Sequence, residues 1–250
     1  MGVEPRNSRA VTAAPEERSQ SEAAFAVSDE HARLEDALVL AAHEIRTPLL
    51  AAKAAVERVL MAPGSTDAWS LLSRLVEGLD TLAHDLSGLL EWASGVRNLE
   101  LEPLHVRWVV EEAMKSLGFA MDRSRVVVSG GEGLLVMADR RAMRVALSNL
   151  IRNALAYSPQ GSPVEVRVAV RDGLVWITVA NSGPGISPVE HTRVFEPFSR
   201  GRNGNGWPGS GLGLYIVRRV VDAHDGRLLL ESDGAGTAVT IALAGGRTLS

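Results

Sequence analysis

One short run, residues 43–49, combines a nucleophile, a base and a helix-bending residue. The imidazole of His43 can attack an electrophile when it is neutral and exposed, and Glu44 beside it can accept the proton from its other nitrogen. Thr47 follows His43 by four residues and so shares its helix face. Pro48 removes a helical hydrogen bond at a cost of about 3 kcal/mol, which predicts a bend beside the histidine. An isolated histidine of this kind is most often a solvated surface side chain.

A second polar pair, Asn149 and Asn153, lies one turn apart on a helix predicted to begin after Asp139 and run to residue 156. An amide oxygen is a good ligand for Mg²⁺, which also keeps waters and phosphate oxygens in its shell. Read alone, the pair is equally compatible with two ordinary surface amides. By itself the pair is a weak signal for a magnesium site.

Two glycine clusters follow, at residues 181–185 and 209–213, the second directly before an apolar helix. Such a loop presents backbone N–H groups and a helix N-terminus to an anionic phosphate. Alone, a G-x-G-x-G pattern is also typical of turns and linkers. The stretch between the clusters is rich in Gly, Asn and Arg, and is either a plain loop or a mobile lid that brings Arg200 and Arg202 to a phosphate.

The elements that must hold the histidine are two predicted helices. Apolar residues alternate in steps of four and three over about four heptads, which predicts a helical seam over residues 34–59. A second seam covers residues 69–96, after a loop with Pro63 and Gly64 that ends the first. On the first seam His43 falls on the face away from the core. A hairpin with one wide apolar face needs a second copy to cover it, which predicts a homodimeric four-helix bundle.

After residue 102 the periodicity becomes mixed. Helices are predicted over residues 109–117 and 212–223, and strands over 125–128, 134–137, 164–170, 175–179, 228–230 and 238–242. Asp172-Gly173 between two alternating strands predicts a hairpin. The pattern indicates an α+β sandwich in which helices cover one sheet. We therefore divide the chain into a disordered leader (1–28), a dimerising helical hairpin (29–102) and an α/β domain (103–250).

Composition excludes several classes of function. The formal net charge of -4 gives no footprint for nucleic acid. The chain has no cysteine, which excludes disulfides and thiolate metal sites. Its apolar stretches are too short to span a membrane, and its N-terminus lacks an apolar signal core. We expect a cytoplasmic protein with no membrane span.

Together these motifs resemble those of the sensor histidine kinases of two-component systems, over residues 34–243. Residues 43–49 resemble the family's H-box, 149–154 its N-box and 181–186 its first glycine box. Residues 195–198 resemble the F-box, 209–214 the second glycine box, and both 225–226 and 236–237 the terminal glycine motif. The resemblance implies a dimeric helical hairpin followed by a Bergerat-type α/β sandwich that binds ATP.

The same resemblance implies a role for each matching residue. His43 would be the phosphoacceptor and Glu44 its base, while Thr47 would position water to dephosphorylate the partner, a response regulator receiver domain. Asn153 would bind Mg²⁺ and Asn149 would support the phosphates. The remaining nucleotide-binding positions would be Tyr157 and Asn181 near adenine, with Gly183, Gly185, Arg200, Gly209, Gly211, Leu212, Gly213 and Thr237 around it and the triphosphate.

Two positions depart from the family pattern. Asn181 stands where the family usually has an acid that reads the adenine amine, so a charge-assisted hydrogen bond becomes a neutral one. Ala156 stands where the family often has Lys or Arg, which removes a phosphate contact. An ATP hydrolase of the same superfamily is disfavoured, because Asn149 cannot act as its catalytic base. A pseudokinase that docks a receiver domain is the other alternative, and we favour the active kinase over it.

Overall fold

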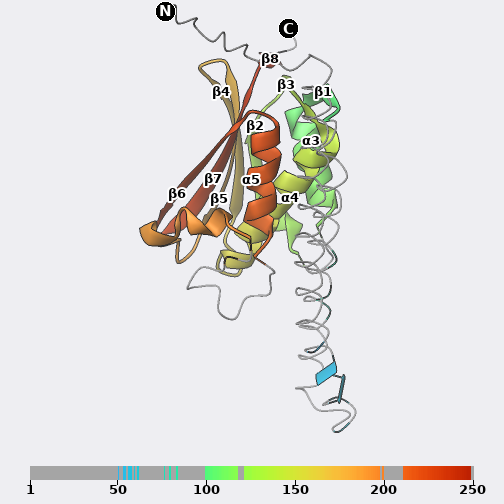
Figure 1. Cartoon of the computed structure of the whole chain (residues 1–250), viewed down its shortest axis with the longest axis vertical. Helices are drawn as coiled ribbons and strands as arrows, with labels where there is room; N and C mark the ends of the chain where they lie inside the picture. Colours follow the sequence, from blue (N-terminus) through green and yellow to red (C-terminus); the bar gives the residue numbers. More distant parts are fainter. Residues whose placement is uncertain are drawn as a thin grey trace, which may run out of the picture. The chain divides into compact units, whose positions relative to one another are not determined.

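The computed structural model describes residues 50, 53–54, 56–57, 59, 61, 76, 79, 83, 99–117, 121–197, 199 and 211–248. The described residues between 50 and 83 are all helical, in agreement with the predicted hairpin but too few to establish it. The hairpin, its dimeric bundle and the three domain boundaries therefore stay predictions. Figure 1 shows the described α/β domain, whose helices lie along one side of a twisted sheet.

The main sheet has five strands in the order β2-β4-β5-β7-β6. These are β2 (Val126–Gly130), β4 (Val164–Arg171), β5 (Leu174–Ser182), β6 (Arg227–Asp233) and β7 (Gly236–Ala244). β2 and β4 are parallel, and all other neighbours are antiparallel. The predicted β-hairpin between β4 and β5 is confirmed. Asp172 and Gly173 in its turn both have positive φ, 51° and 73°, as a tight two-residue hairpin turn requires.

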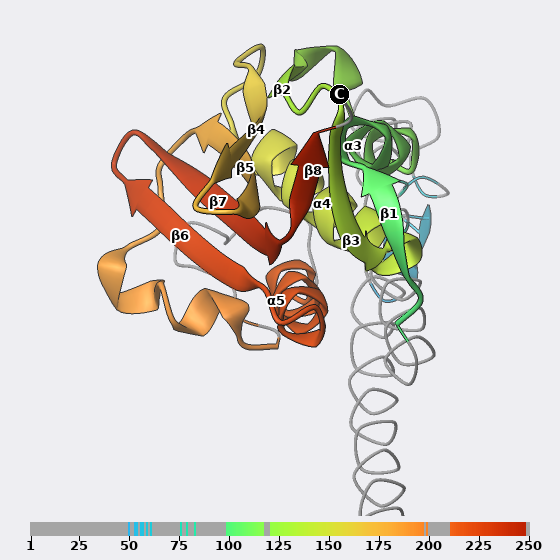
Figure 2. The same cartoon turned by 90° about the horizontal axis from the view of Figure 1, so that it is seen from above.

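Three helices cover one face of this sheet: α3 (Val106–Lys115), α4 (Arg140–Tyr157) and α5 (Gly213–Ala223). Figure 2 shows α4 and α5 beside the strands on the same side. Alternate residues of the strands point into the core, as the sequence predicts. The core joins them to the apolar stripes of the helices, with Val166, Ile177 and Ile241 from the sheet and Leu147, Ile151 and Ile216 from the helices fully or almost fully buried. Burial of each such side chain contributes about 1.5–3 kcal/mol.

A second, three-stranded sheet was not predicted. It consists of β1 (Leu101–His105), β3 (Leu134–Asp139) and β8 (Gly246–Thr248), in the order β1-β3-β8. Pairing is antiparallel throughout. The described residues of the domain also include the short 3-10 turns η1 (Arg123–Arg125), η2 (Pro188–Glu190) and η3 (Arg193–Phe195). The prediction of a single helix-covered sheet is thus correct for the main sheet and omits the smaller one.

Candidate functional site

Helix α4 carries both asparagines of the predicted site. It begins after Asp139, whose Oδ1 accepts a hydrogen bond from the Ala142 N–H at 2.9 Å, as the sequence predicts. Such a cap satisfies one of the free N–H groups of the first turn. Asn149 is fully buried and Asn153 is half-buried. The interpretation of the pair as two ordinary surface amides is therefore wrong for Asn149.

The buried amide of Asn149 is hydrogen bonded at both ends within α4. Its Nδ2 donates to the Val145 carbonyl at 3.0 Å, and its Oδ1 accepts from Nη2 of Arg152 at 3.0 Å. Buried polar groups are tolerated in a protein core when they are satisfied in this way. The two bonds fix the direction in which the amide oxygen points.

Helix α5 begins directly against these asparagines. A Cβ added to Gly213 would lie 3.1 Å from Oδ1 of Asn149 and 3.5 Å from Nδ2 of Asn153. The preceding Leu212 is fully buried, and Gly211 has a φ of 78° that favours glycine. The second glycine cluster thus lets the N-terminus of α5, with its outward N–H groups, approach the two amides closely.

Asn181 lies near the end of β5, the central strand of the main sheet. Its backbone is paired with Val164 of β4 on one side and with Thr237 of β7 on the other. Its Nδ2 donates to the Ser182 carbonyl at 2.7 Å. The side chain is half-buried, and its Oδ1 remains available as an acceptor at the edge of the site.

The first glycine cluster packs between α4 and the turn that joins β6 to β7. A Cβ on Gly183 would lie 2.6 Å from the Tyr157 carbonyl at the end of α4. A Cβ on Gly185, whose φ is 66°, would lie 1.6 Å from the Asp233 carbonyl. Glycine is therefore required at both positions by close backbone approach. The Gly183 N–H also donates to the Ala235 carbonyl at 3.1 Å.

A serine that the sequence analysis did not single out anchors the same turn. The Ser232 hydroxyl accepts from the Ile186 N–H at 2.8 Å and donates to the Gly236 carbonyl at 2.8 Å. It also lies 2.8 Å from Oγ1 of Thr237. The first glycine cluster and the predicted terminal motif around Thr237 are thereby joined through one side chain.

The structure brings most of the predicted nucleotide residues to one end of the domain. Asn149, Asn153, Tyr157, Asn181, Gly183, Gly185, Gly211, Leu212, Gly213 and Thr237 belong to the adjoining segments just described. Asp225 and Gly226 do not join them, because β6 separates them from the turn at Gly236 by seven residues, about 20 Å of strand. His43, Glu44, Thr47, Arg200, Arg202 and Gly209 lie outside the described residues.

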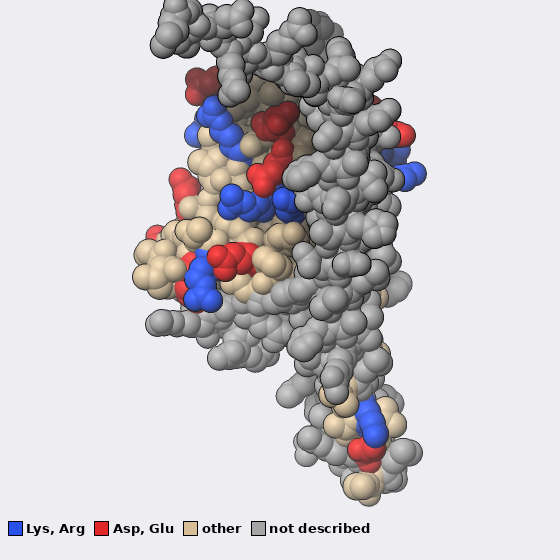
Figure 3. Space-filling view, in the orientation of Figure 1, with Lys and Arg blue, Asp and Glu red and all other residues tan. Residues whose placement is uncertain are grey.

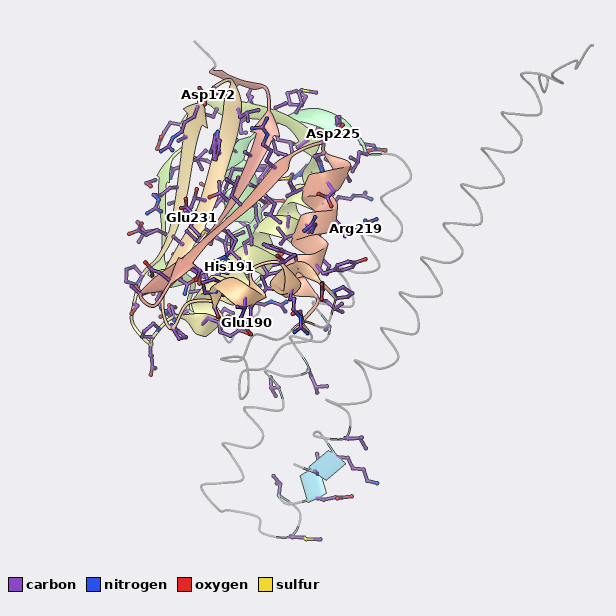
Figure 4. The ribbon with its side chains drawn as sticks, turned by 60° about the vertical axis from the view of Figure 1, so that its left-hand side comes forward. Asp172, Glu190, His191, Arg219, Asp225 and Glu231 are labelled. Atoms are coloured by element: carbon purple, nitrogen blue, oxygen red, sulfur yellow. The ribbon has the colours of Figure 1, made fainter. Side chains whose placement is uncertain are left out.

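Figure 4 shows which end of the domain holds this arrangement. Asp172, in the turn between β4 and β5, and Asp225, after α5, lie at one end. Glu190 and His191, shortly after the first glycine cluster, lie at the other end. Asn181 is at the end of β5 away from Asp172, so the candidate site shares the end that carries Glu190 and His191.

The residues present fit a magnesium ion that is bound mainly by its substrate. Among the described residues there is no group of three His, Cys, Asp or Glu side chains that could hold a metal. A single amide ligand, Asn153, suits Mg²⁺ when phosphate oxygens and waters complete the octahedron. The described residues therefore do not form a magnesium site in which all ligands come from the protein.

The face of the domain drawn in Figure 3 carries basic and acidic side chains in alternation and not in areas of one sign. Partly or largely exposed ion pairs of the described residues include Arg167–Glu165 at 2.6 Å and Arg140–Glu112 at 3.4 Å. An interleaved surface gives no extended field for a polyanion. In the described part of the chain, no helix combines the length and the apolar character that crossing a membrane requires.

Arg152 and Ser232 are the polar residues of the site that sequence reasoning missed. A signal for Arg152 was present, since it is charged yet falls three residues after Asn149 within a largely apolar helix. Ser232 had no local signal, because its partner Ile186 is 46 residues away along the chain.

Comparisons with known proteins agree with this geometry. The family model for histidine kinase-, DNA gyrase B- and HSP90-like ATPases matches residues 138–246. The sensor-like histidine kinase SenX3 of Mycolicibacterium smegmatis is 31% identical over 230 residues, which cover 86% of this chain and 59% of SenX3. The chain thus spans somewhat more than half the length of that curated relative.

Solved structures show the same relationship. The mycobacterial sensor histidine kinase MprB is 33% identical, with a TM-score of 0.50, over 60% of this chain and 99% of that one. Full-length ShkA, solved in complex with AMPPNP, is 25% identical with a TM-score of 0.55, over 86% of this chain and 46% of that one. The chain belongs to the sensor histidine kinases and carries their ATPase domain in residues 138–246.

Proposed function

We propose that this chain is a protein-histidine kinase that phosphorylates its own His43 from Mg-ATP and passes the phosphoryl group to an aspartate of a response regulator. The observation that carries the proposal is the meeting of Asn149 and Asn153 with the glycine-led start of α5 at Gly213. An amide for a hard cation, that of Asn153, and a helix N-terminus for phosphate are thereby at one place. Family membership and the AMPPNP complex of ShkA support ATP as the nucleotide.

In this proposal Asn153 holds Mg²⁺, which would neutralise phosphate charge when bound. The start of α5 at Gly213 faces the triphosphate with its first N–H groups, and Asn181 accepts from the adenine amine through Oδ1. Ala156 contributes no charge, so the phosphates have one contact fewer than is usual in the family. These residues bind and orient the nucleotide, which is the larger part of catalysis in phosphoryl transfer.

The covalent chemistry belongs to residues 43–47. A ring nitrogen of His43 attacks the γ-phosphorus, a phosphorus–nitrogen bond forms, and the bond to the bridging oxygen of ADP breaks. Glu44 takes the proton from the other ring nitrogen. A carboxylate oxygen of the receiver aspartate then attacks the phosphorus and the phosphorus–nitrogen bond breaks. Glu44 returns the proton to the ring, which leaves an acyl phosphate and a neutral imidazole. Thr47 would orient a water molecule that hydrolyses this acyl phosphate on the receiver domain.

We further propose that the protein acts as a cytoplasmic homodimer. The support is the pair of heptad seams. Leu79, a position of the second seam, is 36% exposed in a single copy. Burying the apolar side chains of both seams in a four-helix bundle removes that surface from water.

One observation favours the alternative of a docking scaffold without turnover, namely the loss of a basic residue at Ala156. The active kinase and the scaffold both predict a dimer that binds a receiver domain. They differ in whether the protein becomes phosphorylated by γ-labelled ATP.

The deciding experiment incubates the full chain with Mg²⁺ and γ-labelled ATP. An active kinase gives a protein label that is labile in acid and stable in alkali, as expected of a phosphohistidine. His43→Gln should abolish this label while nucleotide binding and the circular dichroism spectrum stay unchanged. Undiminished labelling of that variant would show that another residue is the acceptor, and no label on the wild-type protein would favour the scaffold.

A further inference from the structure

A buried cation lies between the two asparagines of α4 and has no role in the function proposed above. Arg152 is only 8% exposed, although its side chain is the most strongly basic that a protein can carry. Burying a guanidinium is unfavourable unless its donors are satisfied. One donor, Nη2, bonds Oδ1 of Asn149 at 3.0 Å. One partner of Arg152 is therefore the neighbouring site residue.

This bond completes the fixation of the Asn149 amide. Because Nδ2 is bonded to the Val145 carbonyl, a flipped amide would turn its NH₂ group toward the guanidinium and its oxygen toward a carbonyl. Both contacts would be repulsive. The oxygen accordingly stays where it faces Gly213, at 3.1 Å from the place a Cβ would occupy.

We propose that Arg152 is a positioning residue for the phosphate end of the nucleotide site. By holding Asn149, it makes this amide a rigid spacer that sets how closely the start of α5 at Gly213 approaches α4. The half-buried Asn153, on the same side of Gly213, remains the amide that meets the metal. Asn149 then acts through packing and not as a magnesium ligand. The inference rests on the proposed nucleotide-binding function and deepens it.

The test replaces Arg152 with Met, which has a similar length and no donor. Displacement of fluorescent trinitrophenyl-ATP from the full chain gives the affinities for Mg-AMPPNP and for adenosine separately. We expect Mg-AMPPNP to bind about tenfold more weakly, the effect of one lost hydrogen bond to a charged group. Adenosine affinity should not change, because the base end of the site is untouched. Arg141→Met, an exposed arginine in the first turn of α4, is the matched control and should alter neither affinity.

A double-mutant cycle asks whether Arg152 acts through Asn149. If it does, Arg152→Met should add little further loss in an Asn149→Ala background. Fully additive losses would overturn the inference, as would an Arg152→Met variant that binds Mg-AMPPNP like the wild type. Wild-type protein that does not bind Mg-AMPPNP would instead refute the proposed function itself, and the inference with it.

Near-ultraviolet circular dichroism and the melting temperature report whether Arg152→Met still folds. If it does not, Arg152→Lys is measured in its place, since it retains one charged donor. Its expected Mg-AMPPNP affinity lies between those of the wild type and a variant without the bond, with adenosine binding unchanged. A lysine variant in which both affinities fall together would show a general structural defect and overturn the positioning role.

Discussion

Replacing Asn181 with Ala is expected to weaken ATP binding without unfolding the domain. The backbone of Asn181 is held in the central strand by pairing with Val164 and Thr237, which a side-chain truncation leaves intact. The truncation removes the amide, whose Nδ2 donates to the Ser182 carbonyl at 2.7 Å. That bond directs Oδ1 away from Ser182, so the amide presents an acceptor and not a donor to the base.

The magnitude follows from the kind of hydrogen bond that is lost. A neutral bond contributes about 1 kcal/mol, which corresponds to about a fivefold change in Kd. Asn181→Asp would make the bond charge-assisted and worth about 1.5–3 kcal/mol. However, the second carboxylate oxygen would then face the Ser182 carbonyl, where the amide now donates. The expected gain for Asn181→Asp is therefore several-fold and at most about tenfold.

Calorimetric titration with a non-hydrolysable ATP analogue measures both variants. The same titration with an inosine nucleotide, which lacks the exocyclic amine, should show a much smaller difference between Asn181→Ala and wild type. Thr178→Val is the matched control on the same strand. It removes the hydrogen bond between Thr178 and Thr240 but lies away from the site, so its nucleotide affinity should equal that of the wild type.

Two results would refute this reasoning. If Asn181→Ala binds the ATP analogue as tightly as wild type does, Asn181 does not read the base, and the scaffold alternative gains support. If Asn181→Ala weakens the inosine and adenosine nucleotides equally, the effect comes from the shape of the pocket and not from the amine.

Three further predictions concern other parts of the chain. Gly213→Ala should lower the melting temperature by a few degrees and weaken nucleotide binding, because its Cβ would lie 3.1 Å from Oδ1 of Asn149 and overpacking costs about 1–3 kcal/mol. Gly234→Ala is the control for thermal stability, since a Cβ there meets no atom within 4 Å. Equal melting temperatures of the two variants would contradict the close approach at Gly213. The chain should be a dimer with or without nucleotide, and a monomer in light scattering at micromolar concentration would contradict the two apolar seams. Thr47→Ala should keep autophosphorylation but slow dephosphorylation of the cognate receiver, and equal phosphatase rates would remove its proposed role.

The parts of the fold that were predicted are those with strong local signals. Asp139 marks the start of α4, and Asp172-Gly173 marks the turn of the hairpin between β4 and β5. β1 was missed because Pro103 interrupts it, and a proline without an N–H argues against a strand. The structure tolerates it because, among the described strands, β1 lies at the edge of its sheet and pairs with β3 alone. β8 was missed because its pairing with β3 joins residues more than a hundred positions apart.

The candidate site likewise contains residues that the sequence predicts and residues that it does not. The glycines and asparagines were predictable, since close approach and hard-cation binding restrict residue type strongly. Ser232 was not, because serine is common on surfaces and only its distant partner reveals its role. Arg152 offered a signal in its charge three residues after Asn149, but only its burial and its bond to Asn149 assign it a role. Asp225 and Gly226 were placed in the terminal glycine motif by resemblance, yet only Gly236 and Thr237 reach the site.

The contacts between α4 and α5 both stabilise the core and fix the geometry of the site. At the end remote from the site, Nε2 of His224 accepts from the Asp139 N–H at 2.9 Å, and its Nδ1 bonds the Val220 carbonyl at 2.7 Å. At the site, Asn149 packs against Gly213. The two helices are thus held together near both ends. Because the same contacts stabilise the core and shape the phosphate end, a substitution there changes affinity and stability together. An affinity measured at Asn149, Arg152 or Gly213 therefore reports on nucleotide contacts only when the melting temperature of the same variant is known.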